Sequence, residues 1–458
     1  MNPGWPADPT QAGEPDRAAL SRDWGTPVDP TKASVRPSAW ETFKPVQDIF
    51  VPPGRTPSGW GVFDTSSRCP AAGKAAVSQL QAGLAPHRLL RSTSKLGRPL
   101  PRRTRALLGA FTGLGPSGFN EAVGGWLTDQ NRQLVWYELA VNRAEFQYLT
   151  NPDGVAADAL YTQAGQTTVA TNANSRHPNG LYFPVGEPPK GTDVQTWDRL
   201  GATEVKAAWR VLTGLPSLWP RYHLTQAWVA DPDTGKCTQA VLGLVGLHII
   251  RNTATFRNFA WATFEHIDNA PDLAPAYTDP YTHPFGYSFN NPQCTGSKSN
   301  ACKPNQPRVD GNGKPLFPRT EPVQVMREYA IPAQVAQLNL SVQQAIRANN
   351  SASVFQYYQL VNVLWGQSIA QPVTAPNQAP PLATQGMVSV GNSPVANTTL
   401  ETYAQSRTCV SCHAYAHIKD NASLASDFSF VFGETQAGQS MDERVREKMQ
   451  RGRTSDSR

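Results

Sequence analysis

The residues best suited to chemistry lie near the C-terminus, in the hexapeptide TCVSCH at positions 408–413. On a helical turn, Cys409, Cys412 and His413 occupy positions i, i+3 and i+4, so all three side chains project from one face. Two thiols at that spacing can each add to one vinyl group of a haem, and the histidine that follows can coordinate its iron. The motif predicts one covalent c-type haem, with Cys409 and Cys412 as attachment points and His413 as the proximal iron ligand.

Two other uses of the cysteine pair fit less well. A zinc site could combine Cys409 and Cys412 with Cys294 and Cys302. The second pair is widely spaced, whereas zinc-binding pairs usually have about two to four residues between ligands. A thioredoxin-like redox pair would lie between a strand and a helix early in a βαβ unit. TCVSCH is instead C-terminal and follows a predicted helix.

A second iron ligand has to come from upstream of the motif. The two methionines that follow His413, Met441 and Met449, lie in a charged tail, which disfavours the architecture of a small class I cytochrome c. The best distal candidates are Met387 and His248, and the latter lies within the apolar segment GLVGLHII. Packing of Met387 in a loop and burial of His248 as a core histidine with satisfied nitrogens stay open as alternatives.

Other titratable residues near these candidates are less specific. His417 is expected one helical turn beyond His413 on the same face, where it could not reach the distal side. Glu265, His266 and Asp268 in WATFEHIDNAP could move protons at a haem pocket. On a strand, Glu265 and His266 face opposite sides, so at most one of them can share a site with the haem. The alternative is a strand end with polar caps.

The elements that position these residues are predicted to be strands in the middle of the chain and helices after it. Apolar and polar residues alternate at 203–213, which indicates a strand, and further candidate strands lie at 134–142, 222–230, 238–250 and 259–267. The turn signal DPDTGKC and the short connections favour antiparallel pairing. Apolar residues three and four positions apart predict helices at 334–349 and 354–366, and Asn397 with Glu401 predicts a further helix start. The expected fold is α+β: a large, loop-rich antiparallel β body with a C-terminal helical segment that carries the haem-attachment motif.

Four regions are expected along the chain. They are a flexible N-terminal arm (1–35), a β-rich body with helices towards its end (36–398), a haem-attachment segment packed on that body (399–440) and a charged tail (441–458). Within the body, the segment 367–398 is rich in Pro, Ala and Asn and predicts a long surface loop. Loops of that length are uncommon unless they have a role such as covering a cofactor.

Composition narrows the possible partners. The chain has 458 residues, of which 39% are hydrophobic, and no apolar run approaches the roughly 20 residues of a membrane span. The net charge is +6, but seven cations lie in one run without acids at 88–105. Without them the rest of the chain has a net charge of −1, which argues against a nucleic-acid-binding protein. This run could dock an acidic redox partner, neutralise haem propionates or form a solvated loop. Its cations are Arg88, Arg91, Lys95, Arg98, Arg102, Arg103 and Arg105.

The remaining cysteines bear on the compartment. Cys294 and Cys302 close the small-residue loop CTGSKSNAC, which fits a disulfide and an oxidising environment. Cys69 and Cys237 would form a second bridge, although other pairings and buried thiols stay open. The N-terminal residues lack a signal peptide, whereas haem attachment in bacteria occurs outside the cytoplasmic membrane. We therefore expect a periplasmic or extracellular protein whose sequence is given in a mature or truncated form.

The chain resembles a group of large bacterial monohaem cytochrome c family proteins with no assigned substrate. The resemblance extends from WETFKPVQDIFVPPG (40–54) to FSFVFGE (428–434). Its most characteristic segments are WLTDQNRQLVWYELAVNRAEF, GATEVKAAWRVL, VGLHIIRNTATFRNFAWATFEHIDNAP and NTTLETYAQSRTCVSCHAYA. The resemblance implies a secreted or periplasmic monohaem protein. Arg251 departs from the pattern, because related sequences often have a second histidine three residues after the one matching His248, and this weakens a bis-histidine role for the strand.

Two functions are expected from these features. In the first, the protein transfers electrons to a partner protein and its iron is six-coordinate. In the second, it is a haem-dependent oxidoreductase with an open distal face for peroxide, oxygen or a small substrate. A zinc-stabilised binding module is the third possibility and requires a colourless protein.

Overall fold

The structure is a computed structural model. It describes residues 43–51, 54–60, 89–90, 126–150, 159–171, 180–186, 201–230, 237–253, 258–273, 280–294, 302–307, 322–366, 379–384, 386–419 and 421–434. The expected N-terminal arm, the charged tail, Cys69 and nearly all of the basic run lie outside these residues. So do the side chain of Cys237 and the first part of the predicted loop 367–398.

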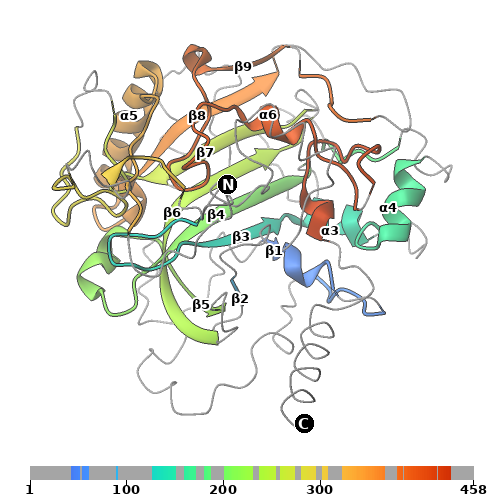
Figure 1. The fold of residues 1–458 in the computed structure, drawn as a ribbon, viewed down its shortest axis with the longest axis horizontal. Helices are drawn as coiled ribbons and strands as arrows, with labels where there is room; N and C mark the ends of the chain where they lie inside the picture. Colours follow the sequence, from blue (N-terminus) through green and yellow to red (C-terminus); the bar gives the residue numbers. More distant parts are fainter. Residues whose placement is uncertain are drawn as a thin grey trace, which may run out of the picture.

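Nine strands form one sheet in the described part of the chain (Figure 1). Along the order β1-β3-β4-β6-β7-β8-β9 every neighbouring pair is antiparallel. β5 also pairs antiparallel with β6, whereas the short β2 pairs parallel with β5. The strands are β1 (Lys44–Pro45), β2 (Leu89–Leu90), β3 (Trp136–Val141), β4 (Thr203–Val211), β5 (Leu224–Ala230), β6 (Cys237–Arg251), β7 (Ala260–His266), β8 (Tyr358–Gly366) and β9 (Met387–Ser389). The predicted antiparallel β body is confirmed.

The longest strand, β6, organises the sheet. It has 15 residues, enough to pair with β4 on one side and with β5 and then β7 on the other. His248 lies opposite Lys206 of β4 and Thr263 of β7, so these three side chains share one face of the sheet. We call this the motif face, because residues 395–432 pack on it. Gly246 makes that approach possible, since a Cβ there would lie 2.2 Å from Oγ1 of Thr399.

Helices cover the sheet at both ends (Figure 1). α5 (Ala333–Asn349) lies beside β8 and confirms the helix predicted at 334–349. Near β3 and β4 lie α3 (Arg143–Thr150) and α4 (Gln163–Ala170). None of the helices in the described ranges has the length and apolar character that a membrane-spanning segment needs.

The helix predicted at 354–366 is wrong. Residues Val354–Tyr357 form a short 3-10 helix, η9, and β8 follows it. Both faces of β8 are covered: Leu360 packs in the cluster around α5, whereas Leu364 packs in the core of the motif face. A register shift in its pairing with β7 adds one more residue. Because both faces carry apolar residues and the strand contains one extra residue, the apolar residues of β8 do not alternate with polar ones. They occur three and four positions apart instead, as in a helix.

The helix predicted after Asn397 is also absent. The contacts of a helix start do form, because the Asn397 side chain accepts the N–H of Thr399 and Glu401 accepts the N–H of Asn397. The chain then continues in turns rather than in a helix. Hydrogen bonds from Asn397 to Thr263 and from Thr398 to Glu265 tie this segment to β7. Tertiary contacts therefore override the local signal.

Candidate functional site

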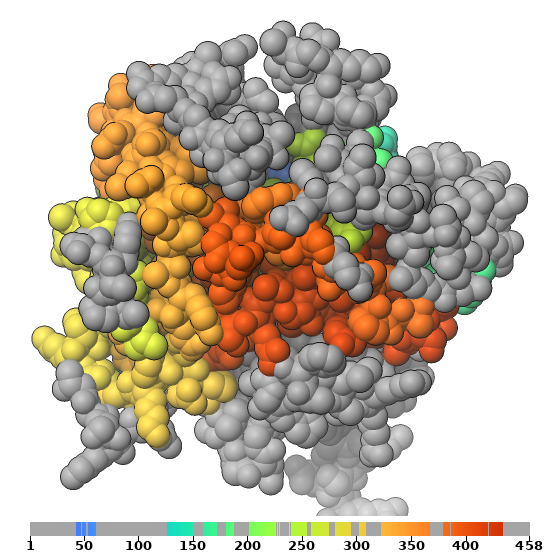
Figure 2. All heavy atoms as spheres, turned by 90° about the horizontal axis from the view of Figure 1, so that it is seen from above, coloured from blue at the N-terminus to red at the C-terminus, as the bar shows by residue number. Residues whose placement is uncertain are grey.

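The predicted attachment motif lies on a single helical turn. α6 comprises Cys409–His413, and the N–H of Thr408 donates to Oγ of Ser411 at 3.2 Å at its start. Cys409, Cys412 and His413 are each partly exposed, and neither cysteine is in a disulfide. The turn therefore presents two thiols and an imidazole together, as the spacing predicted. Seen from above (Figure 2), the surface around this region belongs mainly to the C-terminal third of the chain, coloured orange to red.

The ring of His413 is oriented by its surroundings. Its Nδ1 lies 2.7 Å from the carbonyl oxygen of Phe428. A carbonyl only accepts, so Nδ1 carries the proton, and in the neutral ring the lone pair lies on Nε2. The ring also packs edge-on against Trp261 of β7 at 4.6 Å and against Phe430 at 5.1 Å between centroids. Metal-binding histidines usually donate their second ring N–H in this way, which fixes the tautomer and the ring orientation, so His413 has the support that an iron ligand would need.

The loop predicted to cover a cofactor does contact the motif. The N–H of Leu382 donates to the carbonyl of Ala414 at 2.8 Å, and Sγ of Cys409 lies 3.8 Å from the carbonyl oxygen of Val395. We call residues 382–395 the strap. Met387, one of the two distal candidates, lies in β9 within this strap and packs against the same core cluster as Cys409.

The thiol of Cys409 is not a reactive thiolate. Burial, followed by the charge of Glu401, raises its pKa well above the ordinary value. A redox-active cysteine pair needs a thiol whose pKa is lowered, so that the thiolate can attack. The environment of Cys409 therefore disfavours a thioredoxin-like role.

The other distal candidate, His248, is paired with a carboxylate. Its Nε2 lies 2.8 Å from Oε1 of Glu401. Burial acts to raise the pKa of Glu401, but the charge and hydrogen bond of His248, with the charge of Lys206, lower it below the ordinary value. One ring nitrogen of this buried histidine therefore has a partner, which favours the alternative of a core histidine that the sequence left open. No described contact joins His248 to His413.

His417 does not lie where the sequence places it. α6 ends at His413, and His417 instead forms a β-bridge with Ala425. The chain reverses between them, with Ile418 and Leu424 joined by a backbone hydrogen bond. Nδ1 of His417 lies 2.8 Å from the carbonyl oxygen of Ile418, and its Nε2 is buried without a hydrogen-bond partner. The expectation that His417 lies on the face of the motif helix is therefore wrong.

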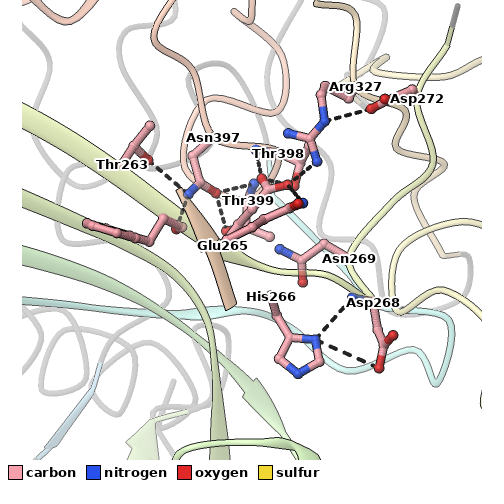
Figure 3. Close-up of polar contacts among 12 residues, drawn as sticks. Thr263, Glu265, His266, Asp268, Asn269, Asp272, Arg327, Asn397, Thr398 and Thr399 are labelled. Atoms are coloured by element: carbon pink, nitrogen blue, oxygen red, sulfur yellow. Dashed lines mark hydrogen bonds and ion pairs between the residues drawn. The ribbon is translucent and has the colours of Figure 1, made fainter. Parts of the chain in front are cut away.

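Glu265 belongs to a buried structural network on the motif face (Figure 3). It forms an ion pair with Arg327, which also binds Asp272 at 2.7 Å, and it accepts hydrogen bonds from the backbone and hydroxyl of Thr398 at 3.0 and 2.7 Å. Asn397 adds a bond to Thr263. This network joins β7 to the segment that leads into the motif.

His266 points to the opposite side of the sheet, as strand geometry predicted (Figure 3). Its Nε2 lies 2.9 Å from the carbonyl oxygen of Arg221, its Nδ1 accepts the N–H of Asp268, and its ring stacks on Tyr222 at 4.0 Å. Burial lowers the pKa of His266 to about 4, so the ring is neutral at neutral pH. Asp268 in turn binds Arg221 and His283. His266 and Asp268 therefore hold a strand end together.

The zinc alternative loses two of its four ligands. Cys294 and Cys302 form a disulfide with a Cα–Cα distance of 5.3 Å, which confirms the predicted bridge. Within the described ranges, no group of three or more His, Cys, Asp or Glu side chains is arranged to hold a metal ion.

Sequence reasoning missed the groups that support His413. The carbonyl of Phe428 is a backbone atom and carries no side-chain signature, and Trp261 looked like an ordinary strand residue. The segment FSFVFGE, which belongs to the resemblance described above, was the one signal that the region around Phe428 is specific. Comparisons with protein-family models, with curated proteins and with solved structures gave no match.

Proposed function

We propose that this protein is a c-type cytochrome with one covalently bound haem and that it acts in electron transfer. The observation that carries the proposal is the arrangement of Cys409, Cys412 and His413 on one helical turn, with Nδ1 of His413 bonded to the carbonyl of Phe428. When bound, a haem supplies a one-electron couple between ferrous and ferric iron. Cys409 and Cys412 would hold it through thioether bonds, and Nε2 of His413 would be the proximal ligand.

The residues around His413 support a stable ligand geometry. Phe428 fixes the tautomer, and the rings of Trp261 and Phe430 restrict rotation of the imidazole. Restricting a ligand before and after electron transfer reduces the reorganisation that each transfer requires. These contacts favour electron transfer over a haem-dependent oxidoreductase activity, with a redox partner protein as the source or acceptor of the electron.

Met387 is the better supported of the two distal candidates. The strap that contains it is hydrogen-bonded to the motif turn at Leu382 and at Val395. His248 would first have to give up its bond to Glu401. A thioether needs no deprotonation and no exchange of partners to bind iron.

The disulfide between Cys294 and Cys302 supports the proposed location. Disulfides persist in the periplasm and outside the cell, where c-type haem is also attached in bacteria. We therefore propose a periplasmic or extracellular protein.

The test is an optical spectrum of the protein produced together with a haem-attachment system. We expect haem that stays bound after denaturation, and reduced bands that carbon monoxide does not shift. Cys409→Ser with Cys412→Ser should abolish covalent binding, whereas His283→Ala, a histidine outside the motif, should leave it intact. A colourless protein, or a His413→Ala variant with an unchanged spectrum, would contradict the proposal.

Carbon monoxide also separates the proposal from its alternative. A high-spin spectrum that carbon monoxide shifts would indicate an open iron and a haem-dependent oxidoreductase. If the spectrum is low-spin, Met387→Ala and His248→Ala identify the distal ligand, because only removal of the true ligand converts a low-spin spectrum to a high-spin one.

A further inference from the structure

Three carboxyl groups from distant parts of the sequence meet inside the protein. Glu145 lies on α3, Glu204 on β4, and Asp427 in the C-terminal segment, with exposed fractions of 0%, 3% and 7%. The side chains of Glu145 and Glu204 lie within hydrogen-bond reach of each other, and Asp427 is close enough to repel both electrostatically. We call these residues the acid cluster.

Glu145 cannot be an ordinary ionised carboxylate. Both of its side-chain oxygens are buried, and neither accepts a hydrogen bond as long as both Glu145 and Glu204 are ionised. A buried charge without partners is strongly unfavourable, so the group gains a proton instead. A protonated carboxyl can donate its O–H to Glu204, and one shared proton then satisfies the pair. Burial, with repulsion from Glu204 and Asp427, accordingly raises the pKa of Glu145 well above its ordinary value.

Asp427 is the third site for protons. Its Oδ2 accepts the N–H of Phe183 at 2.7 Å. Burial and the charge of Glu204 nevertheless raise its pKa to about 7, against the effect of that hydrogen bond. Among the described residues, no lysine or arginine lowers the pKa of either Glu145 or Asp427.

Other ionisable groups lie near the cluster. Tyr148 and Tyr182 face Asp427, whose charge adds to burial in raising the pKa of both phenols. Lys44 directs its amino group to Ser58 and Gly59. Further charged side chains lie on the elements that carry or pack against the cluster. They are Arg143 of α3, Glu138 of β3, Lys206 of β4, Asp48 of η3 (Val46–Asp48) and Arg251 of β6.

The acid cluster is joined to the proposed haem ligand through the backbone. Asp427 and Phe428 are consecutive residues with φ of +50° and +66°, a conformation that side chains other than glycine rarely adopt. This turn directs the Asp427 carboxyl to Phe183 and the Phe428 carbonyl to His413. The carboxyl of the cluster and the carbonyl that bonds His413 therefore belong to neighbouring buried residues, a setting in which charges interact more strongly than in water.

We propose that the acid cluster takes up a proton from water when the protein accepts an electron. The inference rests on the proposed function, with the electron supplied by a one-electron donor protein. A haem held by His413 would accept the one electron, while one carboxylate of the cluster gains one proton and becomes a carboxylic acid, so the added charges offset each other. Because coupling is reciprocal, protonation of the cluster favours reduction, and the reduction potential falls as pH rises through the region near 7.

The test begins with the haem-loaded protein, since absence of covalent haem would contradict the proposed function and not the acid cluster. The midpoint potential is then measured from pH 5 to 9 in wild type, Glu145→Gln and Asp427→Asn. We expect a decrease with pH in wild type and a flatter profile in both variants. Glu328→Gln, an exposed acid outside the cluster, should match wild type. Haem propionates also titrate, so the decisive quantity is the difference between wild type and the cluster variants.

Two further measurements keep the inference testable if a variant folds poorly. In wild type, the reduced-minus-oxidised infrared spectrum should contain a carboxylic acid C=O band that shifts in heavy water, and an indicator dye should report proton uptake on reduction. A pH-independent potential in protein that carries haem would overturn the inference, and so would profiles in Glu145→Gln and Asp427→Asn identical to that of wild type. Stabilisation of wild type by Ca²⁺, lost in Glu145→Gln, would also overturn it, because the cluster would then hold a cation.

Discussion

Asp427 shows how one buried carboxyl can combine a structural and an electrostatic role. Its hydrogen bond from Phe183 fixes the turn that supports His413, while burial and Glu204 make its negative charge unfavourable. A group whose pKa in the folded state is raised contributes stability at low pH. That contribution is complete below the pKa of the unfolded chain, near 4, and is lost as pH rises through the folded value of about 7.

Asp427→Asn should therefore flatten the dependence of stability on pH. The amide keeps an oxygen for the N–H of Phe183 but has no proton to lose. Relative to wild type, the variant should gain up to about 4 kcal/mol between pH 4.5 and pH 8, an upper limit because the shift spans roughly three pKa units. Guanidinium unfolding followed by tryptophan fluorescence at both pH values measures the gain. The idea fails if Asp427→Asn and wild type differ by the same amount at each pH.

The pair of Glu265 and Arg327 permits a second prediction. Both side chains are buried, and removal of one takes away the ion pair between them, although Arg327 keeps its second pair with Asp272. Glu265→Gln and Arg327→Met should each lower the free energy of unfolding by about 3–5 kcal/mol. The double variant should lose clearly less than the sum, because neither charge remains. Denaturant unfolding of the four proteins gives the coupling energy, and additive losses would show that the two groups do not interact.

Among the elements, the strap and α6 form one unit. The backbone bond from Leu382 to Ala414 and the contact of Cys409 with Val395 join them at two points. The side chain of Leu382 is buried in the core of the motif face. We therefore expect its packing to limit how often the motif turn opens to solvent.

Leu382→Ala should increase hydrogen exchange in the motif selectively. The lost packing should cost about 2–5 kcal/mol, and peptides that cover residues 409–416 should exchange faster than the rest of the sheet. Leu360→Ala is the matched control, because Leu360 is equally buried but packs near α5. Mass spectrometry of the exchanged peptides measures both variants. Equal acceleration in the two would show that the strap does not protect the motif.

Sequence alone predicted the elements in which one physical signal dominates. The strand at 203–213 alternates because one of its faces is more apolar than the other, and the spacing of TCVSCH requires little beyond a helical turn. β8 was missed because both of its faces are covered. The helix predicted after Asn397 is absent because hydrogen bonds to β7 hold that segment in turns. The acid cluster could not be predicted, because Glu145, Glu204 and Asp427 are far apart in the sequence and meet only in the folded chain.

At the scale of the whole molecule, the large sheet acts as a scaffold for the motif face. His248, Trp261 and Glu265 project from it towards the C-terminal segment and hold that segment through an ion pair, a ring contact and hydrogen bonds. A body of this size surrounds the motif with buried groups of low polarity, in which charge interactions are stronger than in water. The scaffold thus places the buried acid cluster in surroundings that would strengthen its proposed coupling to a haem at the partly exposed motif.

The disulfide between Cys294 and Cys302 stabilises this scaffold by restricting the unfolded chain. The cysteines are eight positions apart, and closing a loop of that length removes unfolded-state entropy worth about 2–3 kcal/mol. Cys294→Ser with Cys302→Ser should lower the free energy of unfolding by this amount, measured by denaturant unfolding under oxidising conditions. Addition of a reductant should reproduce the loss in wild type and have no effect on the double variant. If the reductant destabilised both proteins equally, a bridge other than Cys294–Cys302 would have to supply the stability.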